Sequence, residues 1–145
     1  MSVCTFFGHR ECYGLDAQVL SNAIEAQIGQ GVEEFLVGNQ GQYDAMVRRC
    51  LKTLQLQYPH IRYRVVLAYL PGEKLEFEDD SDTMYPEGIE MVHPKFALDW
   101  RNRYLIDTAD ICLCYINQTW GGAYKFACMA KRRGRTVINL GCAAI

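Results

Sequence analysis

Short apolar runs alternate with longer amphipathic segments along the whole sequence, and this alternation leaves few folds open. Five runs have the composition of β-strands, at residues 3–7, 34–37, 63–70, 111–116 and 136–140. Between them, apolar residues recur at helical spacing over residues 16–30, 42–57, 95–108 and 123–133. Strands that are apolar on both faces and separated by helices favour a parallel sheet. We therefore predict an α/β fold, a three-layer αβα sandwich with a five-stranded parallel sheet.

The length and composition indicate one ordinary domain. The chain has 145 residues, enough for a single continuous core, and we expect one domain over residues 1–145. No apolar run reaches the ~20 residues that a membrane span needs, and the first residues lack the pattern of a signal peptide. We expect a cytoplasmic protein without membrane attachment. A formal net charge of −2 argues against general nucleic-acid binding.

The cysteines and acidic residues do not form a metal-binding pattern. There are 7 cysteines and no CxxC pair, and Cys4, Cys112 and Cys114 lie in apolar runs, which favours buried free thiols. We expect Cys112 and Cys114 to point to opposite faces of their strand. The stretch from Glu73 to Asp82 lacks the spacing and central glycine of an EF-hand, so we interpret it as a solvated loop. With the 3 histidines scattered, we expect no metal site.

Three of the predicted strands end in glycine and polar residues, which marks one edge of the sheet as a candidate ligand site. Parallel sheets bind ligands outside the C-terminal ends of their strands, near the point where the strand order reverses. The candidate ligand-binding residues of these three turns are Gly8, His9 and Arg10, then Gly38, Asn39, Gln40 and Gly41, and finally Thr119, Trp120, Gly121 and Gly122.

Each candidate has a structural interpretation beside the functional one. Arg10 either clamps a phosphate or carboxylate or is a solvated residue of a tight turn, and its position at a strand end favours the ligand role. Asp44 either accepts hydrogen bonds from ribose hydroxyls or is an acidic residue stabilised by the helix dipole. Gly121 and Gly122 indicate an anion-binding nest at a helix N-terminus. Trp120 beside them either stacks on a base or caps the edge of the core.

A further pair of candidates lies on the predicted helix at residues 95–108. Arg101 and Asn102 either point towards the same edge of the sheet or form an ordinary surface pair. Their spacing alone does not decide between these two interpretations.

Several segments together resemble a known family. The start CTFFGHR, the glycine turn followed by Asp44, and the segments WRNRYLIDTAD and WGGAYKFACMAKRRGRTVINL resemble the SLOG superfamily (Smf/DprA–LOG), especially its YpsA-like, DUF1273 branch. The most specific parts are the GHR opening and the junction that carries Arg101, Asn102, Asp107 and Asp110. The resemblance implies a Rossmann-like fold that binds nucleotides or related ligands, and it implies a homo-oligomer. It also implies that some members hydrolyse nucleotide N-glycosidic bonds.

The sequence departs from the hydrolytic members of that family. Those members carry a pattern like PGGxGTxxE, whose glutamate serves catalysis. Here Gly121 and Gly122 match the paired glycines, but Tyr124 and Lys125 replace the Gly-Thr pair, and Cys128 stands where the glutamate is expected. The glycines between residues 38 and 44 are also spaced differently. We therefore expect ligand binding without that hydrolysis, and we assign neither a catalytic residue nor a cofactor.

The leading functional hypothesis is non-catalytic binding of a nucleotide-derived small molecule. An ADP-ribose-type signal is one example, and the protein then acts as a stand-alone sensor or as a sequestering protein. One alternative is a nucleotide or nucleoside N-glycosidic hydrolase that uses Asp44, or an acid of residues 73–82, in place of the missing glutamate. Another alternative is a structural subunit of an assembly, in which the glycine turns serve only the fold.

Overall fold

The computed structural model describes residues 2–69 and 82–145 of the chain. The elements are β1 (Ser2–Gly8), α1 (Ala17–Gly29), β2 (Val32–Val37), α2 (Gly41–Gln57), β3 (Arg62–Val66), β4 (Asp82–Met84), η1 (Ile89–Met91), α3 (Pro94–Thr108), β5 (Ile111–Tyr115), α4 (Gly122–Arg132) and β6 (Thr136–Asn139). The acidic stretch that we interpret as a solvated loop lies outside the described residues, except for its last residue, which begins β4. No described helix has both the length and the apolar character needed to cross a membrane.

The described strands form one parallel sheet in the order β4-β3-β2-β1-β5-β6. The prediction of a parallel α/β fold is confirmed, but the prediction of five strands is wrong because the sheet has 6. The additional strand is β4, which pairs with β3 over 3 residues with the sequence DTM. A strand so short and partly polar carries no periodic signal, so the sequence does not predict it.

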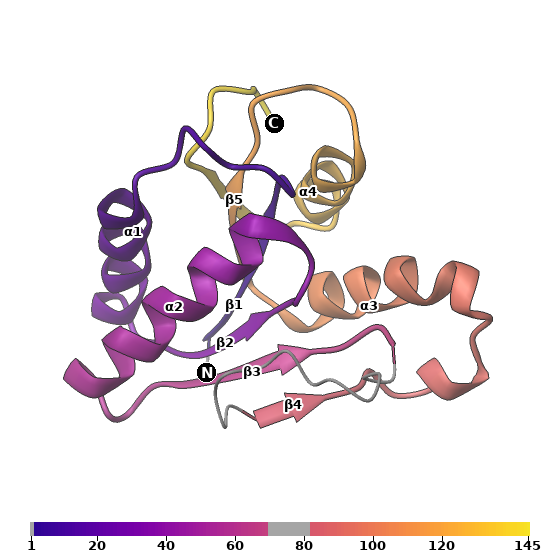
Figure 1. Ribbon diagram of the computed structural model, residues 1–145, viewed down its shortest axis with the longest axis horizontal. Coiled ribbons are helices and arrows are strands. Elements are labelled where there is room, and N and C mark those ends of the chain that lie inside the picture. The colour runs from indigo at the N-terminus through magenta and orange to yellow at the C-terminus, as the bar shows by residue number, and fades with distance from the viewer. Residues whose placement is uncertain (1, 70–81) are drawn as a thin grey trace.

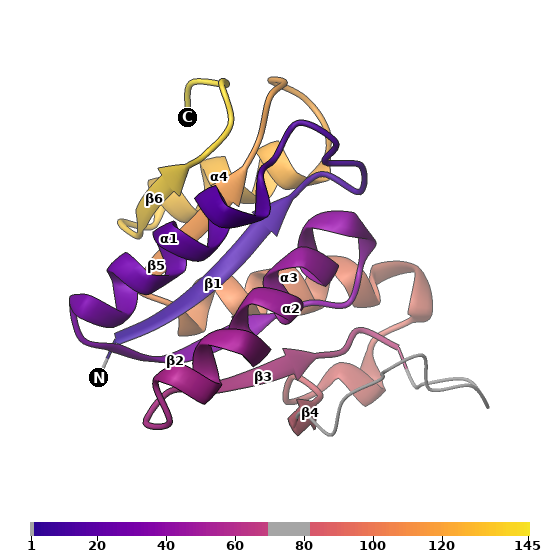
Figure 2. The same ribbon diagram turned by 60° about the vertical axis from the view of Figure 1, so that its left-hand side comes forward.

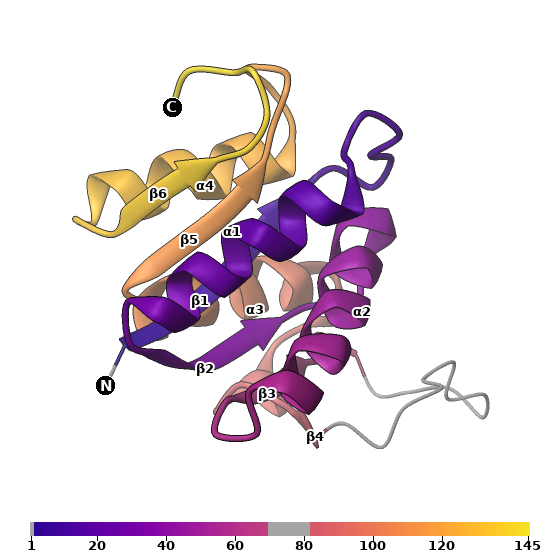
Figure 3. The same cartoon turned by 90° about the vertical axis from the view of Figure 1, so that its left-hand side faces the viewer.

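Helices cover both faces of the sheet, as Figures 1 and 3 show. On one face α1 and α2 pack over Cys4 and Phe6 of β1. On the other face α3 and α4 cover Phe7, whose ring stacks on Phe126 with centroids 6.0 Å apart. Successive residues of a strand point to opposite faces, so β1 contributes to both halves of the core. The result is the expected three-layer sandwich.

The direction of strand progression reverses between β1 and β5. From β1 the chain moves through β2 to β3, whereas from β5 it moves the opposite way to β6 (Figure 2). Because such crossovers are right-handed, the helices that follow β1 and β2 lie on one face of the sheet, and the helix that follows β5 lies on the other. The turns that follow β1 and β5 therefore lead away from each other, and a ligand site is favoured between them.

The helices begin with different kinds of cap. Asp16 precedes α1 and accepts a hydrogen bond from the Gln18 N–H at 2.7 Å, which is the usual way to satisfy a first-turn donor. His93 precedes α3, and its Nδ1 accepts the Lys95 N–H at 3.1 Å. Among the described residues no side chain caps α4, which starts after Gly121 with φ 91°. The first N–H groups of α4 therefore have no side-chain acceptor.

The cysteines of the sheet are buried free thiols, as expected. Cys4 lies on the face covered by α1 and α2, and both Cys112 and Cys114 lie on the other face. The expectation that Cys112 and Cys114 point to opposite faces is wrong, because residues two apart in a strand share a face. Burial raises the pKa of Cys112 to about 12. Within residues 2–69 and 82–145, no group of three or more His, Cys, Asp and Glu side chains is placed to hold a metal ion.

Candidate ligand-binding cleft

A cleft of about 240 Å³ opens at the C-terminal edge of the sheet, where the ends of β1 and β5 meet the starts of α2 and α4. The middle of α3 closes its other side. Most of the residues predicted from the three turns and from α3 come together here. The predicted residues that line the cleft are Gly8, His9, Arg10, Gln40, Asp44, Arg101, Asn102, Gly121 and Gly122.

Arg101 places a buried guanidinium at the wall of the cleft. Its side chain is only 4% exposed, its Nη1 donates to the carbonyl of Val66 at 3.0 Å, and its Nε donates to Oδ1 of Asn102 at 2.8 Å. These bonds fix the plane of the guanidinium and account for two of its five N–H donors. Burial lowers the pKa of Arg101 below its ordinary value, and the nearby Asp44 opposes that shift. The interpretation of Arg101 and Asn102 as a surface pair is wrong.

Asp44 brings a buried carboxylate to the same cleft. It is 7% exposed, and its Oδ2 accepts the backbone N–H of Gln40, the residue before α2, at 2.9 Å. Burial raises the pKa of Asp44 above its ordinary value, although Arg101, the bond from Gln40 and Arg48 act in the other direction. Asp44 thus stabilises the start of α2 with one oxygen. Its proposed contact with ribose hydroxyls stays a prediction.

Gly38 allows the two buried charges to approach the end of β2. A Cβ at this position would lie 2.3 Å from Nη1 of Arg101 and 2.6 Å from Oδ2 of Asp44. Any larger residue would displace both groups. Gly38 does not line the cleft itself, so its contribution is to the placement of the charged side chains.

Contacts within the protein account for two other glycines of the predicted site. A Cβ on Gly8 would lie 2.3 Å from the ring of Tyr43, which is fully buried and donates its hydroxyl to the carbonyl of Leu113 at 2.8 Å. Gly41 has φ +87°, and a Cβ there would lie 2.7 Å from Cα of Arg10. The sequence analysis names both as candidate ligand-binding residues, whereas the structure gives each a packing reason.

Gly122, at the start of α4, has no such packing reason. Apart from its chain neighbours and the backbone of its own helix, no atom lies within 4 Å of a Cβ at Gly122, which lines the cleft. The N-terminus of a helix carries a partial positive charge and unpaired N–H groups, which attract anions. Gln118 of the preceding turn also lines the cleft; it was missed because a glutamine in a turn has no distinctive pattern.

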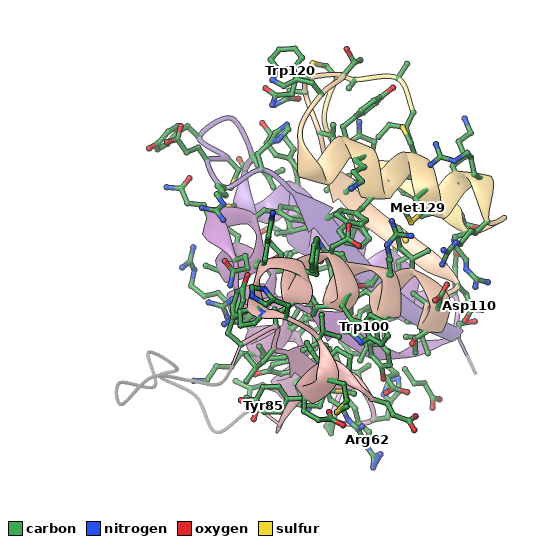
Figure 4. The ribbon with its side chains drawn as sticks, turned by 90° about the vertical axis from the view of Figure 1, so that its right-hand side faces the viewer. Arg62, Tyr85, Trp100, Asp110, Trp120 and Met129 are labelled. Carbon is green, nitrogen blue, oxygen red and sulfur yellow. The ribbon has the colours of Figure 1, made fainter. Side chains whose placement is uncertain are left out.

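The remaining predicted residues lie outside the cleft. Asn39 and Thr119 adjoin lining residues without lining the cleft themselves. Trp120 is 67% exposed, and Figure 4 shows it at the tip of the turn before α4, so the interpretation that it caps the core is wrong. The apolar lining residues were missed because their pattern is that of ordinary core residues; they are Phe6, Phe7, Leu98, Ala123 and Phe126.

His9 joins the two turns that border the cleft. Its Nε2 accepts the backbone N–H of Asn117 at 2.9 Å, and its ring meets Tyr115 edge to face, with centroids 6.2 Å apart. An imidazole nitrogen that accepts a hydrogen bond is unprotonated, which places the ring proton on Nδ1. His9 therefore fixes the position of the turn after β1 relative to the turn after β5.

Two acidic residues of the family-like junction lie away from the cleft. Asp110 accepts the backbone N–H of Val3 at 3.0 Å, and Asp107 pairs with Arg133. Both contacts are at the opposite edge of the sheet, where β1 and β5 begin. Cys128, at the position of the family's glutamate, does not line the cleft either. None of these three residues lines the cleft, whose charged residues are Arg10, Asp44 and Arg101.

Comparison with known proteins does not assign a family. No family model matches the sequence, and no curated protein matches it. The function is therefore inferred from the chemistry of the cleft.

The buried carboxyl of Asp44 predicts a pH dependence of stability. Its pKa in the folded chain is above the ordinary 3.8, so the folded state holds this proton more tightly than the unfolded state. The contribution of Asp44 to the free energy of unfolding should therefore fall as the pH rises from about 3.8 through the raised pKa. Urea denaturation of the wild type and of Asp44→Asn across this range measures the difference. A difference that is constant or that rises with pH would contradict the prediction.

Proposed function

We propose that this protein binds a nucleotide-derived ligand, such as an ADP-ribose-type signal, and does not convert it chemically. The observation that carries the proposal is the buried guanidinium of Arg101 at the cleft wall. Charge-assisted hydrogen bonds from arginine to phosphate are short, strong and often paired. Arg10 at the rim and the uncapped start of α4 add positive potential, so two arginines oppose the single carboxylate of Asp44.

The size of the cleft indicates which part of the ligand it receives. Its volume of about 240 Å³ is below the ~300–1,000 Å³ of pockets that enclose a drug-sized molecule. A phosphate group with its sugar matches this space better than a whole nucleotide does. Asp44 is then available to accept a hydrogen bond from a sugar hydroxyl.

The family resemblance supports the same class of ligand. The SLOG superfamily, to which the GHR opening and the segment around Arg101 are similar, binds nucleotides and related molecules on a Rossmann-like fold. We propose that the protein acts as a sensor of such a ligand or sequesters it, and that it forms a homo-oligomer. The position of the cleft, where the strand order reverses, supports this assignment because parallel α/β sheets bind their ligands there.

One observation favours a second candidate function, hydrolysis of an N-glycosidic bond. Asp44 is a buried carboxyl group in the cleft with a raised pKa, which is a property that general acids and bases need. Incubating the protein with AMP and with ADP-ribose and separating the products by chromatography distinguishes the two functions. We expect both compounds to remain intact. Release of adenine by the wild type, but not by Asp44→Asn, would replace the binding function by the enzymatic one.

Substitution of Gly122 tests the proposed site with little effect on the fold. In Gly122→Val the branched side chain enters open space and blocks the first N–H groups of α4. Loss of hydrogen bonds to a charged group should weaken ADP-ribose binding about tenfold. Isothermal titration calorimetry measures the affinity, and thermal denaturation measures the stability.

Gly29→Val is the matched control. A Cβ at Gly29 likewise meets nothing within 4 Å beyond its chain neighbours and its own helix backbone, but Gly29 ends α1 and does not line the cleft. We expect this variant to bind ADP-ribose like the wild type. Equal affinity of Gly122→Val and Gly29→Val would remove the start of α4 from the site, and no binding by the wild type would reject ADP-ribose as the ligand.

A further inference from the structure

A second pocket lies at the same edge of the sheet, where β3 and β4 end against η1 and the start of α3. Its volume is about 510 Å³. We call it the tyrosine pocket; residues that define it are Tyr69, Tyr85, Ile89, Val92, Pro94 and Ala97. Figure 4 shows Tyr85 next to β4 and Trp100 on α3.

The lining of the tyrosine pocket suits an uncharged, flat group. Tyr69 and Tyr85 are 45% and 37% exposed, so both rings have surface that the described chain leaves uncovered. Glu90 is the one charged residue among the described residues that line it, and its negative charge disfavours an anion. Aromatic rings prefer to pack on one another in stacked or edge-to-face arrangements. These properties favour an aromatic ring over a phosphate.

The tyrosine pocket and the cleft share α3 as a common wall. Ala97 lines the pocket, whereas its neighbour Leu98 and, one turn further along, Arg101 line the cleft. The end of β3 also connects them, because Arg101 donates to the carbonyl of Val66 and Tyr69 follows three residues later. Tyr69 is close enough to Arg101 to influence the pKa of the guanidinium. An anion bound at Arg101 therefore has an apolar pocket beside it.

We infer that the tyrosine pocket holds the aromatic base of the ligand whose phosphate and sugar occupy the cleft. This inference rests on the proposed function and extends it to a ligand of two parts. The cleft has room for a phosphate and its sugar, and the tyrosine pocket offers an uncharged aromatic surface near Arg101 for the rest of the ligand. The base packs against Tyr69 and Tyr85, while the anionic part bonds with Arg101.

Trp120 is the alternative aromatic surface for a base. It is the most exposed tryptophan of the chain, at 67% against 43% for Trp100. Figure 4 shows Trp120 and Tyr85 at opposite ends of the molecule, with α3 and α4 between them. A base on Trp120 and a base in the tyrosine pocket therefore require different directions of the ligand, and substitutions distinguish them.

Calorimetric titration with ADP-ribose and with ribose 5-phosphate, which lacks a base, tests the inference. Stacking of a base on an aromatic side chain typically changes affinity about tenfold or more. We expect Tyr85→Ala to weaken ADP-ribose binding about tenfold and to leave ribose 5-phosphate binding unchanged. Tyr85→Phe keeps the ring and should bind like the wild type, as should Trp120→Ala. Thermal denaturation of each variant confirms that the fold is intact.

The other outcomes separate the inference from the proposed function. Unchanged ADP-ribose affinity in Tyr85→Ala, or a loss confined to Trp120→Ala, overturns the inference and leaves the cleft as the binding site. An equal loss for both probes in Tyr85→Ala also overturns it, because the effect is then not on the base. Absence of binding of both probes to the wild type overturns the proposed function and the inference with it.

Discussion

Replacement of Arg101 by methionine should weaken ADP-ribose binding by about 100-fold. Truncating one partner of a buried, hydrogen-bonded charge pair costs about 2–5 kcal/mol, and ~1.4 kcal/mol corresponds to a factor of ten in affinity. Arg101 is 4% exposed, so little water is available to replace its contacts with the ligand. Methionine retains an unbranched apolar side chain at this position. Isothermal titration calorimetry gives the affinity, and urea denaturation shows whether the variant remains folded.

Two further variants make this result specific. Arg10→Ala removes the same charge at the exposed rim of the cleft, where water screens it, so we expect a smaller loss of about tenfold. Arg101→Lys keeps the charge but not the planar fork of donors, and we expect it to bind between the wild type and Arg101→Met. If folded Arg101→Met bound ADP-ribose as tightly as the wild type, the buried guanidinium would not be the anion site.

Gly8→Ala is expected to lower the free energy of unfolding by about 3 kcal/mol. Overpacking of a filled core costs typically 1–3 kcal/mol, occasionally more, and the added Cβ would lie 2.3 Å from the ring of Tyr43. Tyr43 has little freedom to move, because it is fully buried and its hydroxyl is bonded to the carbonyl of Leu113. Urea denaturation at neutral pH measures the loss.

Gly29→Ala provides the comparison for this prediction. A Cβ at Gly29 has open space around it, and alanine has the higher helix propensity, so this variant should be as stable as the wild type or up to ~1 kcal/mol more stable. Similar stabilities of Gly8→Ala and Gly29→Ala would show that the ring of Tyr43 moves aside without cost.

Most of the fold follows from local patterns in the sequence. The four helices and five of the strands have the periodicity of their class, and their observed ends are close to the predicted ones except at β3. The strand β3 ends at Val66, although the apolar run continues beyond it. The strand β4 depends on pairing with β3 and not on its own 3 residues. Pairing of that kind is a tertiary property, which a single short segment cannot reveal.

The sequence predicted most of the polar residues and the glycines that line the candidate site, but none of its apolar side chains. Arg10, Asp44 and Arg101 stand out because polar residues at strand ends or on a helix are recognisable in sequence. Phe7 and Phe126 line the cleft as well, but an apolar residue beside a site has the same pattern as one in the core. The tyrosine pocket was not foreseen for a related reason: it forms where segments on both sides of residues 70–81 meet α3.

The reason for a glycine is equally hard to obtain from sequence. The helix α1 and the strand β2 lie between Gly8 and Tyr43 in the sequence. Even so, the ring of Tyr43 excludes a side chain at Gly8. Gly38 accommodates Arg101, which comes from the other half of the chain. Such requirements exist only after the sheet has assembled.

The hydrogen bond between His9 and Asn117 joins residues 108 apart in sequence. It spans the boundary between β1 and β5, where the strand order reverses. One side of this boundary contains β1 to β4, and the other contains β5, α4 and β6. A ligand bound in the cleft as we propose would contact both sides, so transient opening of either side would release it. By mass action such a ligand would suppress these partial openings as well as global unfolding. We therefore expect binding to slow hydrogen exchange and proteolysis wherever these require such an opening, including in described segments that do not contact the ligand.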